Sequence, residues 1–145
     1  MQSSNQILDK LEGIFGSGAE CITAKHLFEY LNEHPEASHI TLQLTRRIAE
    51  AKLFKPSDTS IVRTLQFLSA EGIGLLDSCF ELVLDEMTPY DLTVDEVKSV
   101  IDDKINPVNG EVDPEIGSKV SIYFRPTTAM RLMLESESSP AGRGN

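Results

Sequence analysis

The sequence of 145 residues contains no tryptophan, only two cysteines and no long apolar run. Two isolated cysteines, Cys21 and Cys79, cannot form the disulfide framework of a small secreted protein. No basic segment followed by an apolar stretch begins the chain, and no apolar run approaches the roughly 20 residues of a membrane-spanning helix. These absences predict a cytoplasmic protein with reduced thiols that does not enter a membrane.

Basic residues are scarce as well, since 13 Lys and Arg stand against 23 Asp and Glu, a formal net charge of −10. Residues 1–70 carry 8 acidic and 7 basic residues, whereas residues 71–134 carry 13 acidic and 5 basic residues. Nucleic acids and anionic membranes are polyanions, so this balance disfavours both as partners. We expect the partner to be another protein, with a basic surface, and a homodimer stays open.

Hydrophobic residues make up 40% of the chain, enough for one folded domain that we expect to cover residues 1–135. Apolar residues recur at helical spacing in four segments, which predicts a helical core over residues 6–70. Thr23 is expected to cap the second of these helices and Ser57 the fourth. The four helices are expected to end at Gly16 to Gly18, Pro35, Pro56 and Gly72.

Residues 73–126 are predicted to form an elaborated β-hairpin. Its first part, residues 74–85, fits a strand and a helix about equally well. We favour a strand, because a glycine break precedes it and a partner strand is available downstream. That partner is residues 119–125, where β-branched and aromatic side chains alternate with polar ones until Pro126.

A short helix is predicted within this hairpin, over residues 93–104, because Thr93 and Glu96 have the spacing of a capping box. Residues 129–135 are expected to add one or two further helical turns. Residues 136–145 are polar, with hardly an apolar side chain, and are expected to form a disordered tail. The predicted fold class is therefore α+β and mainly helical.

Residues 23–85 resemble a winged-helix domain. The resemblance rests on three helical segments and the glycine turn that follows them: residues 27–31, 42–53 and 61–70, then Gly72-Ile73-Gly74-Leu75-Leu76. It implies a winged helix-turn-helix core whose second helix leads into the first strand of the wing, with the returning strand at residues 120–124. The long insertion between the two strands makes this wing an elaborated hairpin that carries an inserted helix, or a small second subdomain.

Basic residues gather around the predicted helix pair and are candidates for contact with nucleic acid. They are Arg46, Arg47, Lys52, Lys55 and Arg63. A recognition helix presents donors on its exposed face, and Arg63 is the only basic residue there. Glu50 interrupts the group, so an ordinary solvated helix face is the alternative interpretation.

Acidic residues form a second candidate surface, for a basic partner. They are Asp77, Glu81, Asp85 and Glu86 near the predicted strand, with Asp102 and Asp103 on the inserted helix. Adjacent carboxylates on a helix do not face each other, so they are poorly suited to acid–base catalysis. A solvated acidic face is again the alternative interpretation.

The sequence shows no recognisable pattern of metal-binding, phosphate-binding or catalytic residues. The three histidines lack the close pairing of zinc ligands, and the glycines at residues 13–18 are not followed by the lysine of a phosphate-binding loop. Residues 106–115 lack the ligand pattern of a calcium loop. Cys21 is expected to precede a helix, where a thiol pKa can fall, but no histidine is placed by sequence to activate it. We expect no enzymatic activity, no metal and no cofactor.

Together these patterns predict a non-catalytic protein–protein interaction module, an accessory or adaptor subunit of a larger complex such as one built around an ATPase or a nuclease. Acidic winged-helix accessory subunits of chromosome-segregation ATPase complexes are similar in using this fold for protein contacts. The first alternative is a DNA-binding transcriptional regulator that uses the winged helix. The second is an acidic DNA mimic that occupies a basic groove.

Overall fold

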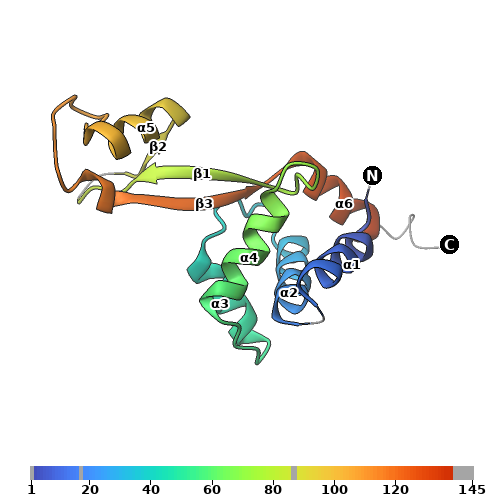
Figure 1. The fold of residues 1–145 in the computed structure, drawn as a ribbon. Helices are drawn as coiled ribbons and strands as arrows, with labels where there is room; N and C mark the ends of the chain where they lie inside the picture. Colours follow the sequence, from blue (N-terminus) through green and yellow to red (C-terminus); the bar gives the residue numbers. More distant parts are fainter. Residues whose placement is uncertain (1, 17, 86–87, 139–145) are drawn as a thin grey trace. The chain divides into compact units, whose positions relative to one another are not determined.

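The computed structural model describes residues 2–16, 18–85 and 88–138 (Figure 1). In these ranges the fold is α+β and mainly helical, as the sequence predicts, with six α-helices and one antiparallel sheet of three strands. The contacts divide the chain into two compact units. Unit 1 comprises Met1–Asp77 and Phe124–Asn145, and unit 2 comprises Ser78–Tyr123.

Unit 1 contains five of the helices: α1 (Ser4–Phe15), α2 (Ala19–Glu33), α3 (Leu42–Ala51), α4 (Asp58–Ser69) and α6 (Thr128–Ser138). The predicted four helical segments are confirmed as α1 to α4. The expectation for residues 136–145 is wrong in its first part, because α6 continues through residues 136–138. Ser4 explains part of this extension, since its backbone N donates to the carboxylate of Glu137. Residues 139–145 lie outside the described part of the chain.

Two helix starts show how local signals decide the boundaries. Ser57 caps α4 as predicted, and its hydroxyl accepts a hydrogen bond from the backbone N of Ser60 at 3.1 Å. The predicted cap at Thr23 is wrong, because α2 begins earlier, after Gly18. Glycine is also an acceptable N-cap, and the following Ala19 favours the helix, so Thr23 becomes a buried interior residue.

Helix α2 is the centre of unit 1, since it contacts α1, α3, α4 and α6. It buries Leu27, Phe28 and Leu31 along one face. Side chains from the surrounding helices and from the ends of two strands complete this core: Ile7, Leu11, Ile40, Ile48, Ile61, Leu65, Leu68, Leu75, Leu76, Phe124, Met130, Met133 and Leu134. Burial on this scale supplies the main driving force for folding of unit 1.

The sheet has the strand order β2-β1-β3, with β1 (Leu76–Leu82), β2 (Tyr90–Leu92) and β3 (Val120–Pro126). The strand interpretations of residues 74–85 and 119–125 are therefore confirmed, whereas β2 was not predicted. Within unit 1, Ile40 and Phe124 form an isolated antiparallel bridge. Their backbones exchange two hydrogen bonds, of 2.8 and 2.7 Å.

Unit 2 contains β2, helix α5 (Val94–Asp103) and a short 3₁₀ helix, η1 (Ile116–Lys119). Its core consists of Leu82, Val100 and Ile116, with Leu84, Leu92 and Val120 partly buried around them. The predicted capping box is confirmed at the start of α5. The hydroxyl of Thr93 accepts from the backbone N of Glu96 at 3.2 Å, and the carboxylate of Glu96 accepts from the backbone N of Thr93 at 2.9 Å.

This cap predicts a pH dependence. The hydrogen bond from the Thr93 backbone, and a second from the Tyr90 hydroxyl, lower the pKa of Glu96. A carboxyl with a lowered folded-state pKa stabilises the fold above its unfolded pKa and loses that contribution as the pH falls through the folded value. We therefore expect the free energy of unfolding of unit 2, measured by urea denaturation of the full chain, to fall less between about pH 6 and about pH 3 in Glu96→Gln than in the wild type. Equal pH dependence of the two proteins would contradict this role.

No helix in the described ranges is both long enough and apolar enough to cross a lipid bilayer.

Candidate interaction surfaces

The five basic candidates all lie in unit 1, on or between α3 and α4. Arg46 and Arg47 belong to α3, Lys52 and Lys55 follow it, and Arg63 lies on α4. Arg46 forms an ion pair with Asp58, the first residue of α4. The Nζ of Lys52 lies 3.8 Å from Oε2 of Glu29 on α2. Two of the five positive charges are thus paired within the protein.

The other three, Arg47, Lys55 and Arg63, are exposed and have no ion pair within the described residues. They are three separate charges on a surface that also carries Asp58. Recognition helices of helix-turn-helix proteins approach base edges with their N-terminal end, and at that end α4 would present the carboxylate of Asp58. This arrangement weakens the electrostatic attraction to phosphate that DNA binding requires.

The acidic candidates are divided between the two units. Asp77 belongs to unit 1, whereas Glu81, Asp85, Asp102 and Asp103 belong to unit 2. Glu86 lies outside the described residues. Asp77, Asp85, Asp102 and Asp103 are exposed.

The predicted acidic surface is wrong at Glu81, because only 8% of this residue is exposed. Asp91 of β2 is its partner across the sheet. The buried Tyr123 of β3 donates its hydroxyl to Oδ1 of Asp91 at 2.9 Å. Because β1 lies between β3 and β2, the ring of Tyr123 must cross the face of β1 that carries Glu81, and this explains the burial. Glu81 is therefore part of the sheet rather than of a partner surface.

Asp91, the neighbour of Glu81 across the sheet, is not among the residues that the sequence predicts for this surface. The three residues of β2 are too few to show a period of two, and they begin shortly after Pro89. The only local sign of this strand was its position, directly before the Thr93 cap. The contact between Asp91 and Tyr123 depends on strand pairing across 32 positions of the chain.

Helix α5 carries the exposed apolar residues Val94 and Ile101, with the half-buried Val97 between them. We call Val94, Val97 and Ile101 the α5 ridge. The acidic residues Asp95, Asp102 and Asp103 of the same helix are exposed, as is Lys98. The surface of α5 therefore combines apolar side chains with negative charge.

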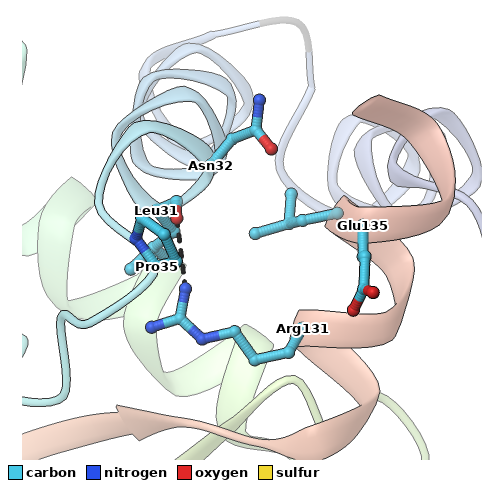
Figure 2. A pocket seen from close by; sticks show the side chains of 6 residues that line it. Leu31, Asn32, Pro35, Arg131 and Glu135 are labelled. Carbon is cyan, nitrogen blue, oxygen red and sulfur yellow. Dashed lines mark hydrogen bonds between the residues drawn. The ribbon is translucent and has the colours of Figure 1, made fainter. Parts of the chain in front are cut away.

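Two hollows are lined by described residues of unit 1. The first has a volume of about 260 Å³ and lies between the end of α2 and α6 (Figure 2). It is lined by Leu31, Asn32, Pro35, Arg131, Leu134 and Glu135. The guanidinium of Arg131 donates to the backbone oxygen of Leu31 at 3.1 Å and to that of Ala37. Two of its donors thus hold the end of α2.

The second hollow, of about 270 Å³, lies beside α2 and α3 and is lined by His26, Glu29, Tyr30, Glu33, Ile48, Ala51 and Lys52. The Nδ1 of His26 is buried and has no hydrogen-bond partner in the described part of the chain. It lies 4.0 Å from Oε1 of Glu29. Since Glu29 also faces Lys52, the wall of this hollow contains a small internal charge network.

The cysteine expectation is wrong in one respect. Cys21 lies within α2, and burial, followed by the negative charges of Glu12 and Asp9, raises the pKa of its thiol. Such a thiol is less nucleophilic at neutral pH than a free cysteine. No group of three His, Cys, Asp or Glu side chains in the described ranges is arranged to hold a metal ion.

No protein-family model, no curated protein and no solved structure matches this chain.

Proposed function

We propose that this protein is a non-catalytic interaction module with a winged-helix-like architecture, and that it serves as an accessory or adaptor subunit of a larger protein complex. The observation that carries the proposal is the segregation of charge between the two units. Unit 2 has 11 acidic and 3 basic residues, a net charge of −8, and unit 1 has 12 acidic and 10 basic residues, a net charge of −2. The strong negative charge of unit 2, next to the nearly neutral unit 1, favours a basic protein surface as the partner.

The distribution of exposed apolar residues supports the same proposal. Unit 2 exposes seven large apolar side chains among its described residues, whereas unit 1, although longer, exposes five. Those of unit 2 are Val83, Tyr90, Val94, Ile101, Val108, Val112 and Ile122. These side chains are candidates for a surface that another protein covers, because contiguous exposed apolar patches mark interaction sites.

The order of elements supports the winged-helix-like architecture. The helix pair α3–α4 leads into the antiparallel strands β1 and β3, as in a helix-turn-helix followed by a wing. Ile40 lies before the pair and forms an isolated antiparallel bridge to Phe124 of β3. Unit 2 occupies the place of the short wing loop. An interaction module of this kind would use the common core as a scaffold and the enlarged wing for binding.

The second candidate function is DNA binding through α3 and α4. The observation that favours it is the exposure of Arg47, Lys55 and Arg63, unpaired within the described residues. The ion pair between Arg46 and Asp58 and the overall negative charge count against it. We therefore rank it second.

One experiment tests the leading proposal. The tagged full chain, expressed at its natural level in the organism that encodes it, is purified and its co-purifying proteins are quantified at increasing salt. We expect at least one stoichiometric protein partner whose retention falls as salt rises, because opposite charges attract across the interface. Asp102→Asn with Asp103→Asn should reduce retention, and Glu12→Gln in unit 1 is the matched charge control. If no partner is enriched over the untagged strain, the proposal is wrong.

A DNA titration separates the second candidate from the first. Fluorescence anisotropy with a random duplex at about 0.15 M salt should show no binding tighter than roughly 10 µM for an acidic interaction module. Tighter binding that weakens steeply with salt, and that is lost in Arg47→Ala with Arg63→Ala, would instead establish the DNA-binding function.

A further inference from the structure

We infer that the α5 ridge is the docking site for a basic, amphipathic helix of the partner protein. This inference rests on the proposed function and makes it specific. It assigns the contact to Val94, Val97 and Ile101, and it assigns to the partner an apolar stripe flanked by lysine or arginine. Four features of unit 2 lead to it.

The first feature is the way in which burial fades around α5. In a helix of 3.6 residues per turn, Val100, Val97, Ile101 and Val94 follow one another around one side, over an arc of about 120°. Val100 is fully buried, Val97 is half-buried, Ile101 is 57% exposed and Val94 is 77% exposed. The apolar arc thus continues well beyond the edge of the small core of unit 2. Its outer part is an apolar surface that is exposed among the described residues.

The second feature is the spacing of the ridge. Val94, Val97 and Ile101 stand at positions i, i+3 and i+7, which form a continuous stripe along a helix. Stripes of this kind pack into the grooves of a second helix. A helical occupant therefore matches the ridge better than a flat surface or an extended peptide.

The third feature is the charge beside the ridge. Going around α5 from Val94, the next residues are Lys98, Asp102 and Asp95, all exposed. Asp103 lies on the opposite side of α5 from Val94, so the carboxylates beside the ridge are Asp102 and Asp95, which outnumber the single lysine. A partner helix lying on the ridge would place its flanking side chains near these carboxylates. Lysine or arginine at those positions would form favourable pairs, and acidic residues would be repelled.

The fourth feature excludes the simplest alternative occupant, a second copy of the chain. A symmetric dimer through the ridge would bring together two units that each carry a net charge of −8. Like charges facing each other across an interface are unfavourable. A basic partner has the opposite effect, so charge selects between the two.

The test uses ¹⁵N-labelled full-length protein and three synthetic peptides of about 18 residues, a length at which a designed helix is stable enough to use. The first peptide has leucines at i, i+3 and i+7 spacing with lysines beside them. The second has glutamates in place of the lysines. The third contains the residues of the first in scrambled order. We expect the first to shift the amide resonances of residues 94–103 and to bind at least tenfold more tightly than either of the others.

Two variants link the signal to the ridge. Val94→Gln with Ile101→Gln removes the exposed apolar side chains but keeps residues that suit a helix, and should weaken binding of the first peptide at least tenfold. Val112→Gln is the matched control, because Val112 is 70% exposed in the same unit but lies outside α5. It should bind as the wild type does. Unchanged circular dichroism of both variants shows that unit 2 stays folded.

Each other outcome overturns the inference in a recognisable way. Absence of binding, or shifts confined to unit 1, would show that α5 is not the docking site. Equal binding of the scrambled peptide would reduce the contact to charge alone. A dimer in sedimentation analysis that dissociates in the Val94→Gln, Ile101→Gln variant would assign the ridge to self-association. A natural partner that co-purifies unchanged with this variant would refute the ridge while leaving the proposed function intact, whereas absence of any partner would refute the proposed function.

Discussion

Replacement of Ile116 by alanine should unfold unit 2 and leave unit 1 folded. Among the described residues, the core of unit 2 has three fully buried apolar side chains, and Ile116 is one of them. Removing a buried isoleucine side chain costs about 2–5 kcal/mol. A unit of this size buries little surface and has little stability to lose. The core of unit 1 contains none of these three residues, so its free energy of unfolding should change much less.

Hydrogen exchange measured residue by residue distinguishes the two units. In Ile116→Ala, amides of β2 and α5 should lose protection, while amides of α2 and α4 should keep it. Val112→Ala, at an exposed position of the same unit, serves as the control and should change neither set. Equal loss of protection in both units would show that the chain unfolds as one cooperative domain, contrary to the division described here.

The same variant separates scaffold from binding surface. If unit 2 carries the partner contact, Ile116→Ala should lose the partner even though unit 1 remains folded. Retention of the partner by this variant would move the contact to unit 1. The charge and the exposed apolar residues of unit 2 make loss the expected result.

Much of the fold follows from local signals in the sequence. The Ser57 cap, the Thr93–Glu96 capping box and the alternation at residues 119–125 each depend on neighbouring residues, and each is confirmed. The choice of a strand for residues 74–85 needed one longer-range argument, the presence of a partner strand. It succeeded because the partner was itself recognisable by its alternation.

Most of the failures have a physical cause in contacts between distant parts of the chain. Thr23 is the exception, because a second local signal, Gly18 followed by Ala19, starts α2 earlier. Glu81 is a charged residue in an alternating strand, yet β2 and Tyr123 enclose it. Residue type alone could not show that Val94 and Ile101 stay exposed, because that depends on how far the small core of unit 2 extends.

The candidate surfaces show the same division. The uneven charge along the sequence corresponds to a structural boundary, since unit 2 accounts for −8 of the total of −10. Which acids lie on the surface, and which apolar residues accompany them, required the structure. The sequence predicts the helix at residues 93–104 but not that Val94 and Ile101 on it are exposed.

Arg131→Met should lower the free energy of unfolding of unit 1 by about 2–3 kcal/mol. Arg131 on α6 donates to the backbone oxygen of Leu31, in the last turn of α2 (Figure 2), and to that of Ala37 beyond it. Hydrogen bonds from a charged donor contribute about 1.5–3 kcal/mol each, and partial exposure to water reduces their sum here. The positive charge also lies near the C-terminus of α2, where the helix dipole favours it. Methionine keeps the apolar stem but removes the charge and both donors.

Arg131→Lys is the matched control for this prediction. Lysine retains the charge but lacks the planar fork of donors, so one ammonium group cannot replace both hydrogen bonds in the same geometry. In urea denaturation followed by far-UV circular dichroism, the midpoints should fall in the order arginine, lysine, methionine. If both variants lose less than about 0.5 kcal/mol in free energy of unfolding, the bonds to Leu31 and Ala37 add little to stability. A loss as large for lysine as for methionine would show that the fork geometry, rather than the charge, holds the end of α2 against α6.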